Sequence, residues 1–194
     1  MGSKLSLRRV FASPTLEGLW GIAPVRASED WKCGAAALVT VMRYLKRTAN
    51  ESQVVDEVGM TKAGCTPEAI ITYLHKKSFR VMGTHETPFH LIIQRIRRRL
   101  PYLLMWMDKP GQWLVGVGAD LTERVGVFAD PTDPDLFVAR PLDDFEEDWN
   151  KTRRVCISIT PFKHLNIHCK RSVYNRLVLW KTPAQIPKSA RNPL

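Results

Sequence analysis

The sequence contains no long apolar run, and this absence excludes a membrane-spanning protein. The longest strongly apolar stretch, residues 103–107, is far shorter than the roughly 20 residues that a helix needs to cross a bilayer. No continuous apolar segment follows the basic residues near the N-terminus, so we expect no secretory signal. The 44% share of hydrophobic residues nevertheless suffices for a core, which argues against a wholly disordered chain.

Cysteine is scarce, and its spacing fits neither a disulfide framework nor a zinc ribbon. The four cysteines are Cys33, Cys65, Cys156 and Cys169. A short cluster of His164, His168 and Cys169 lacks the close cysteine pair that a zinc site needs, so we expect no metal and no cofactor. A reducing compartment is the default for such a chain, which we expect to be cytoplasmic or within an intracellular assembly.

Acidic residues are missing from the end of the chain. Lys and Arg number 29 against 19 for Asp and Glu, and residues 162–194 carry seven cations and no acid. A second cluster, Arg95, Arg97, Arg98 and Arg99, is also basic. Such clusters suit an anionic partner, and nucleic acid is one candidate, although no recognised nucleic-acid motif occurs. The alternatives are a solubilising tail and a solvated helix end.

The order of patterns predicts an α+β fold, with N-terminal helices packed on an antiparallel sheet. We expect an extended N-terminal arm over residues 1–24, a domain over 25–162 and a basic C-terminal extension over 163–194. Helices are expected over 33–46, after a Ser52 N-cap, after Thr66-Pro67, after Thr87-Pro88 and over 143–149. Strands are expected over 102–107, 113–118, 124–128, 136–140 and 154–160.

The most informative stretch is residues 31–38, which read WKCGAAAL. It places Cys33 at the start of an apolar helix, where the helix dipole and free N–H groups favour the thiolate. Gly34 then allows a close approach of backbone. This arrangement is typical of nucleophilic cysteines in peptidases. A small cysteine that merely begins a buried helix would look the same.

The rest of the chain resembles the bacteriocin-processing, double-glycine-type cysteine peptidases, a branch of the papain-like group. The cysteine stretch is similar to the nucleophile motif of that family. Further matches follow in the family's order at residues 64–81, 100–104, 113–118, 128–131 and 141–149. The resemblance implies a papain-like fold.

Carried over to this chain, the resemblance places Cys33 at the nucleophile position and Asp130 where the family orients its histidine. The histidine position itself holds Gln112, just before Trp113. The family's oxyanion glutamine stands six residues before the cysteine, and that position is Ala27 here. A glutamine amide does not accept a proton near neutral pH, and alanine offers no side-chain donor. No histidine occurs between Arg95 and Arg154, so a small shift in alignment does not restore the base.

Three functions compete on these observations. The first is a catalytically degenerate peptidase-like domain that acts as a binding or structural module in a larger assembly. The second is an active cysteine peptidase that uses Cys33 with a non-standard base. The third is a nucleic-acid-associated basic protein, which is compatible with the first.

Overall fold

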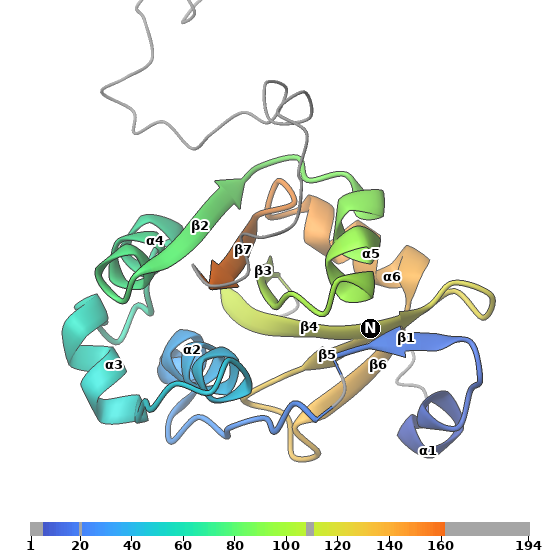
Figure 1. Cartoon of the computed structure of the whole chain (residues 1–194), viewed down its shortest axis with the longest axis horizontal. Coiled ribbons are helices and arrows are strands. Elements are labelled where there is room, and N and C mark those ends of the chain that lie inside the picture. The colour runs from blue at the N-terminus through green and yellow to red at the C-terminus, as the bar shows by residue number, and fades with distance from the viewer. Residues whose placement is uncertain (1–5, 20, 108–110, 162–194) are drawn as a thin grey trace, which may run out of the picture.

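The fold is an antiparallel sheet covered by helices, in a computed structural model that describes residues 6–19, 21–107 and 111–161 (Figure 1). The strand order is β2-β7-β3-β4-β5-β6, and β1 also pairs with β4. The strands are β1 (Leu16–Gly18), β2 (Phe79–Thr84), β3 (Tyr102–Trp106), β4 (Gln112–Asp120), β5 (Val125–Ala129), β6 (Phe137–Pro141) and β7 (Cys156–Pro161). The α-helices are α1 (Leu7–Phe11), α2 (Cys33–Tyr44), α3 (Glu51–Val58), α4 (Pro67–Lys76), α5 (Phe89–Arg97) and α6 (Leu142–Asn150). This architecture confirms the expected α+β, papain-like fold.

Helices gather at two sides of the molecule, α2, α3 and α4 at one and α5 and α6 at the other (Figure 1). Each group has its own apolar cluster with the sheet. Residues of α2 and α4 pack with Trp113, Val115 and Val117 of β4. Residues of α5 and α6 pack with Leu114 and Ala119 of the same strand. A register shift between residues 116 and 118 explains why Val117 and Ala119 join different clusters, because a bulge reverses the alternation of a strand.

Most predicted elements form within one or two residues of their expected bounds, but two helix starts differ. Asn50, not Ser52, caps α3, since its side-chain oxygen accepts the backbone N–H of Gln53 at 2.8 Å. Thr66 caps α4 as expected, with proline following it. At α5 the cap position is Pro88, and the Thr87 hydroxyl instead bonds the hydroxyl of Thr84 at 2.6 Å. The Thr-Pro pair is the same at both sites, but only Thr87 meets another hydroxyl, that of Thr84 three residues earlier.

The segment 1–24, expected to be an extended arm, contains a helix and a strand among its described residues. β1 pairs with β4 in register Leu16 with Asp120, where β4 has run past the end of its pairing with β3. The buried Asp120 carboxylate fixes this segment, because it accepts hydrogen bonds from the hydroxyls of Ser13 and Thr15. A single carboxylate oxygen, Oδ2, accepts both bonds and thus orders a segment whose own sequence has no clear period.

A second hydroxyl fixes the approach to the helix that carries the cysteine. Thr40 of α2 is buried and accepts the backbone N–H of Val25 at 2.9 Å. Its hydroxyl donates to the carbonyl of Ala36 at 2.9 Å, one turn earlier in the helix. The side chain therefore ties residues 24–26 to α2. Among the described residues, no helix is both long and apolar enough to cross a membrane.

Candidate active site

Cys33 is the first residue of α2, where a short 3-10 helix (Asp30–Lys32) leads into the helix. The residue is only 7% exposed. Its thiol receives hydrogen bonds from the backbone N–H groups of Trp113 and Gly34, which favour the thiolate. This contact brings the start of α2 against the start of β4, two segments that lie 80 residues apart in the sequence.

Gly34 is required by a side chain rather than by backbone. A Cβ at this position would lie 2.6 Å from the Sγ of Cys65 and 3.1 Å from Cδ1 of Trp113. The indole N–H of Trp113 donates to the carbonyl of Cys65 at 3.3 Å. The loop before α4 is thus packed directly over the first turn of α2. Gly34 therefore allows a close approach, but of the Cys65 and Trp113 side chains rather than of the backbone that the sequence predicts.

Gln112 and Asp130 are joined directly. The Gln112 amide nitrogen donates to the Asp130 carboxylate, and it donates also to the Thr132 hydroxyl at 2.7 Å. Asp130 additionally accepts the backbone N–H and the hydroxyl of Thr132, both at 2.9 Å. Gln112 is 4% exposed and Asp130 5% exposed, so this network is buried. A buried amide with both partners in place is held in one orientation.

Thr132 is the residue of this network that sequence reasoning missed. It follows the Asp130-Pro131 pair by one position, where a threonine looks like an ordinary turn residue. The signal that could have found it is its register: β5 ends at Ala129, and its partner β4 begins at Gln112. Residues just outside a strand pair lie opposite one another, so Gln112 and Thr132 were candidates for contact.

Ala27 lies beside the same site. Its backbone N–H donates, at 2.9 Å, to the carbonyl of Pro131, the residue that follows Asp130. The four residues assigned to the family's functional positions, Cys33, Gln112, Asp130 and Ala27, therefore lie in connected segments of one region. Their proximity is a finding, whereas their roles in chemistry remain a prediction.

The electrostatics around Cys33 oppose ionisation of the thiol. Burial is the largest effect and raises the pKa of Cys33, and the negative charge of Asp130 acts in the same direction. The two backbone N–H groups lower the pKa without reversing the balance. Burial raises the pKa of Cys65 to about 12. Both thiols are consequently protonated near neutral pH.

The described histidines lie on other elements than the strand that carries Gln112. His75 is exposed on α4, His90 is exposed on α5, and His85 lies in the turn between β2 and α5. His164, His168 and Cys169, together with the basic extension, lie outside the described residues. Among the described residues, no group of three His, Cys, Asp or Glu side chains could hold a metal ion.

The arginine cluster of α5 divides in the structure. The Arg95 guanidinium donates to the carbonyl of Ile159 at 2.8 Å, so this residue ties α5 to β7. Arg97 forms an ion pair with Glu17 at 2.7 Å. Arg98 and Arg99 are exposed at the end of the helix. The four arginines expected to face one anionic partner therefore do not act as one surface.

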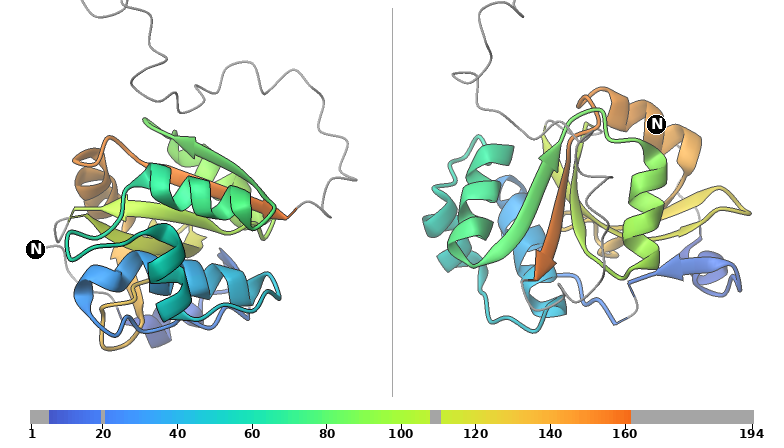
Figure 2. Two further views of the ribbon diagram at one scale, coloured as in Figure 1. Left: turned by 90° about the vertical axis from the view of Figure 1, so that its left-hand side faces the viewer. Right: turned by 45° about the horizontal axis from the view of Figure 1, so that its top comes forward.

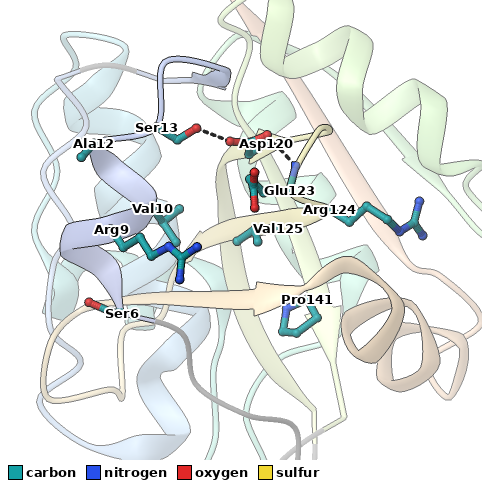
Figure 3. A pocket seen from close by; sticks show the side chains of 10 residues that line it. All are labelled: Ser6, Arg9, Val10, Ala12, Ser13, Asp120, Glu123, Arg124, Val125 and Pro141. Atoms are coloured by element: carbon teal, nitrogen blue, oxygen red, sulfur yellow. Dashed lines mark hydrogen bonds between the residues drawn. The ribbon is translucent and has the colours of Figure 1, made fainter.

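A separate pocket of about 500 Å³ lies between α1 and the turn that joins β4 to β5 (Figure 3). Its floor includes Val10, Val125 and Pro141, and Arg9 and Glu123 line its polar side. Figure 3 shows the hydrogen bond between Ser13 and Asp120 at its rim. None of the residues assigned to the cysteine site lines this pocket.

Several solved structures share this fold. A double-glycine-motif protease from an AMS/PCAT transporter, solved with its leader peptide, is 19% identical, covers 72% of this chain and 91% of its own, and has a TM-score of 0.59. The peptidase domain of Streptococcus ComA, a bi-functional ABC transporter, is 18% identical over 72% and 98%, with a TM-score of 0.62. A C39-like peptidase from Bacillus anthracis is 12% identical over 75% and 97%, with a TM-score of 0.66.

Comparison with curated proteins finds no match. A family model, by contrast, matches most of the chain. The model of the peptidase C39 family covers residues 22–161, which include Cys33, Gln112 and Asp130. Fold, site geometry and family model agree, and the chain belongs to the peptidase C39 family.

Proposed function

We propose that this C39 peptidase-like domain lacks ordinary peptidase activity and acts as a binding or structural module in a larger assembly. The observation that carries the proposal is the hydrogen bond from the Gln112 amide to Asp130, since the resemblance assigns position 112 to the family's histidine. A histidine there would orient on the carboxylate in the same way and exchange a proton with the thiol. The amide keeps the orientation but has no proton to exchange near neutral pH.

The surroundings of Cys33 support the same proposal. Burial and Asp130 raise the pKa of the thiol, so less than about 3% is thiolate at pH 7, the share expected for an ordinary cysteine. Ala27 supplies no side-chain donor, and loss of one oxyanion donor lowers a rate by roughly a hundred- to a thousand-fold. Loss of the general base lowers it by roughly another hundred- to ten-thousand-fold, although the two effects need not add.

A second candidate, an active peptidase with a non-standard base, is favoured by one observation. Cys33 still begins α2 and receives two backbone N–H hydrogen bonds, which is the arrangement that stabilises a thiolate. Such an enzyme would need another group to remove the thiol proton. Asp130, whose charge acts on Cys33, is itself engaged by Gln112 and Thr132.

The chemistry of the partner follows from the fold relatives. One similar structure holds a leader peptide, and another is a domain of a transporter. We therefore favour a peptide or protein partner within a multi-subunit assembly, bound without cleavage.

The test is the rate of Cys33 alkylation by iodoacetamide as a function of pH. Peptide mapping by mass spectrometry reports modification at Cys33 separately from the other thiols, and Cys33→Ser provides the blank. Among the described thiols, Cys156 is fully buried with a pKa of about 12, so it serves as an internal slow reference. Asp130→Asn is the matched variant, because it removes the charge and keeps the shape.

We expect slow alkylation with an apparent pKa above the ordinary value of about 8.5. In Asp130→Asn the apparent pKa should fall, because the negative charge that opposes ionisation is gone. Rapid alkylation below about pH 7 would contradict the proposal and favour the active peptidase. A rise in pKa in Asp130→Asn would mean that Asp130 supports the thiolate, which also favours an enzyme.

A further inference from the structure

The ends of two helices that are distant in the sequence meet at one edge of the molecule. The Tyr44 hydroxyl at the end of α2 donates to the carbonyl of Arg99, just after α5, at 3.3 Å. The Arg47 guanidinium lies over the ring of Phe79, the first residue of β2, at 6.0 Å from the ring centroid. The ends of α2 and α5 and the start of β2 are therefore neighbours.

The end of β7 lies at the same edge. Phe79 pairs with Pro161, which is the last described residue, and Arg95 of α5 bonds the carbonyl of Ile159. Figure 2 (left) shows the arrowhead of β7 and the end of α2 at the same side of the molecule. The remaining chain, residues 162–194, continues from this point in the sequence with seven cations and no acid.

Exposed cations stand at or beside the residues that make these contacts, and we call this set the basic edge. Its members are Arg43, Lys46, Arg47, Arg80, Arg98 and Arg99, all of them exposed. Residues 31–50 and 87–107 contain no acid, and neither do residues 69–85 or 149–161. Within the part of the chain that the structure describes, none of the six forms an ion pair, in contrast to Arg97 with Glu17 and Lys77 with Glu57.

Two of these cations adopt a backbone conformation that glycine usually occupies. Lys46 and Arg99 follow α2 and α5 in left-handed conformations, with φ of 60° and 54°. Each helix end is closed there by a backbone pair, Arg47 to the carbonyl of Met42 and Leu100 to that of Arg95. Glycine is the usual residue at such a position, because a Cβ is strained there.

The end of α3 shows the usual choice within the same molecule. Gly59 occupies the equivalent position with φ of 72°. The left-handed conformation of Lys46 and Arg99 therefore brings a conformational cost that glycine would avoid. Ser78 adopts the same conformation after α4, with φ of 60°. A cation at Lys46 and Arg99 interacts favourably with the C-terminus of its helix.

We propose that the basic edge binds the phosphate backbone of nucleic acid, independently of base sequence. Five of its six cations are arginine, whose planar fork suits the oxygens of phosphate. A lipid surface is the less favoured partner, because membrane-binding faces combine cations with exposed apolar side chains. The large exposed apolar residues described here, Phe11, Met107 and Leu121, belong to other segments. The proposal goes beyond the proposed function and does not depend on the state of Cys33.

The test measures binding of the full chain to a fluorescently labelled DNA duplex of mixed sequence, by anisotropy at several salt concentrations. The key variant is Lys46→Gly with Arg99→Gly, because glycine suits both backbone conformations and should leave thermal stability close to that of the wild type. The control is Arg124→Gly with Arg153→Gly, which removes two exposed arginines whose φ values are 52° and 56°. These arginines pair with Asp143 and Glu86 and lie outside the basic edge.

If all six cations contact phosphate, they contribute about −5 to the slope of log K against log salt. Loss of two contacts should make that slope shallower by about 2 units and weaken binding roughly 50-fold near 0.1 M salt. The control variant should keep most of the wild-type affinity.

Three results would overturn the proposal. The first is a folded wild-type chain that does not bind the duplex. The second is an equal loss of affinity in the two double variants, which would mean that net charge alone matters. The third is a basic-edge variant that binds DNA as tightly as the wild type does. If that variant binds anionic vesicles more weakly than the wild type, the partner is a lipid surface.

Discussion

Replacement of Gln112 by histidine should turn the Cys33 thiol from an inert group into a reactive one. Position 112 directly precedes Trp113, whose backbone N–H contacts the thiol, and its side chain already bonds Asp130. A histidine on the same backbone would have one ring nitrogen for the carboxylate and the other for the thiol. When protonated, the histidine would place a positive charge beside Cys33. That charge would lower the pKa of the thiol, which the present surroundings raise.

The size of the effect follows from two opposing changes. At about pH 6, a cysteine with an ordinary or raised pKa is at most about 0.3% thiolate. If the imidazolium lowers the pKa of Cys33 to about 6, half of the thiol ionises, a gain of more than about 100-fold. A thiolate of lower pKa is also a weaker nucleophile, by roughly tenfold over that range. We therefore expect alkylation near pH 6 to be faster by about tenfold, with a new low-pH plateau.

The assay is the pH dependence of Cys33 alkylation in wild type, Gln112→His and Gln112→Ala, with thermal denaturation as a check of folding. The low-pH plateau should appear with histidine only and should diminish when Asp130→Asn is added. Hydrolysis of a peptide should remain weak, because Ala27 still lacks a donor; adding Ala27→Gln should increase any turnover by roughly a hundred- to a thousand-fold. A folded Gln112→His protein with an unchanged pH profile would refute the assignment of position 112 to the side of the thiol.

Three further predictions concern the fold. Gly116→Ala should destabilise the protein by more than about 1–3 kcal/mol in chemical denaturation, because its Cβ would lie 1.9 Å from the buried Tyr102 ring; an unchanged midpoint would contradict the close packing. Hydrogen bonds from the Ser13 hydroxyl and other donors lower the pKa of Asp120. The carboxylate therefore stabilises the folded state above about pH 4, and this stabilisation is lost as the pH falls through the lowered pKa. In Asp120→Asn, loss of stability over that acid range should be smaller, as measured by thermal melts against pH. Thr40→Val should cost roughly 1 kcal/mol, since a backbone N–H loses its acceptor, and equal stability would show that water replaces it.

Local chemistry predicted the helices and strands well wherever the signal involves neighbours in sequence. Thr66 and Pro67 start α4 because a hydroxyl and a proline act within one turn. Thr87 and Pro88 show the same letters, yet Thr87 bonds Thr84 and leaves the helix start. The partner hydroxyl lies only three residues earlier, but whether the two hydroxyls meet depends on where β2 ends.

The site divides in the same way. Cys33, Gln112, Asp130 and Ala27 were predicted from the order of motifs along the chain. Thr132 was missed, because its role exists only once β4 lies beside β5 and brings two strand ends together. The pKa of Cys33 was also beyond the sequence. A helix start favours the thiolate, but burial against other elements opposes it more strongly.

The sequence by itself determined the class of fold, the position of the cysteine on its helix and the presence of glutamine just before Trp113, because each depends on residue type and order. The tertiary structure alone decided which charges act together. It removed Arg95 and Arg97 from the predicted arginine cluster through contacts with Ile159 and Glu17. It brought Arg99 instead to the end of α2, where the Tyr44 hydroxyl bonds its carbonyl. Electrostatic interactions depend on distance in space, and spacing along the chain does not specify that distance.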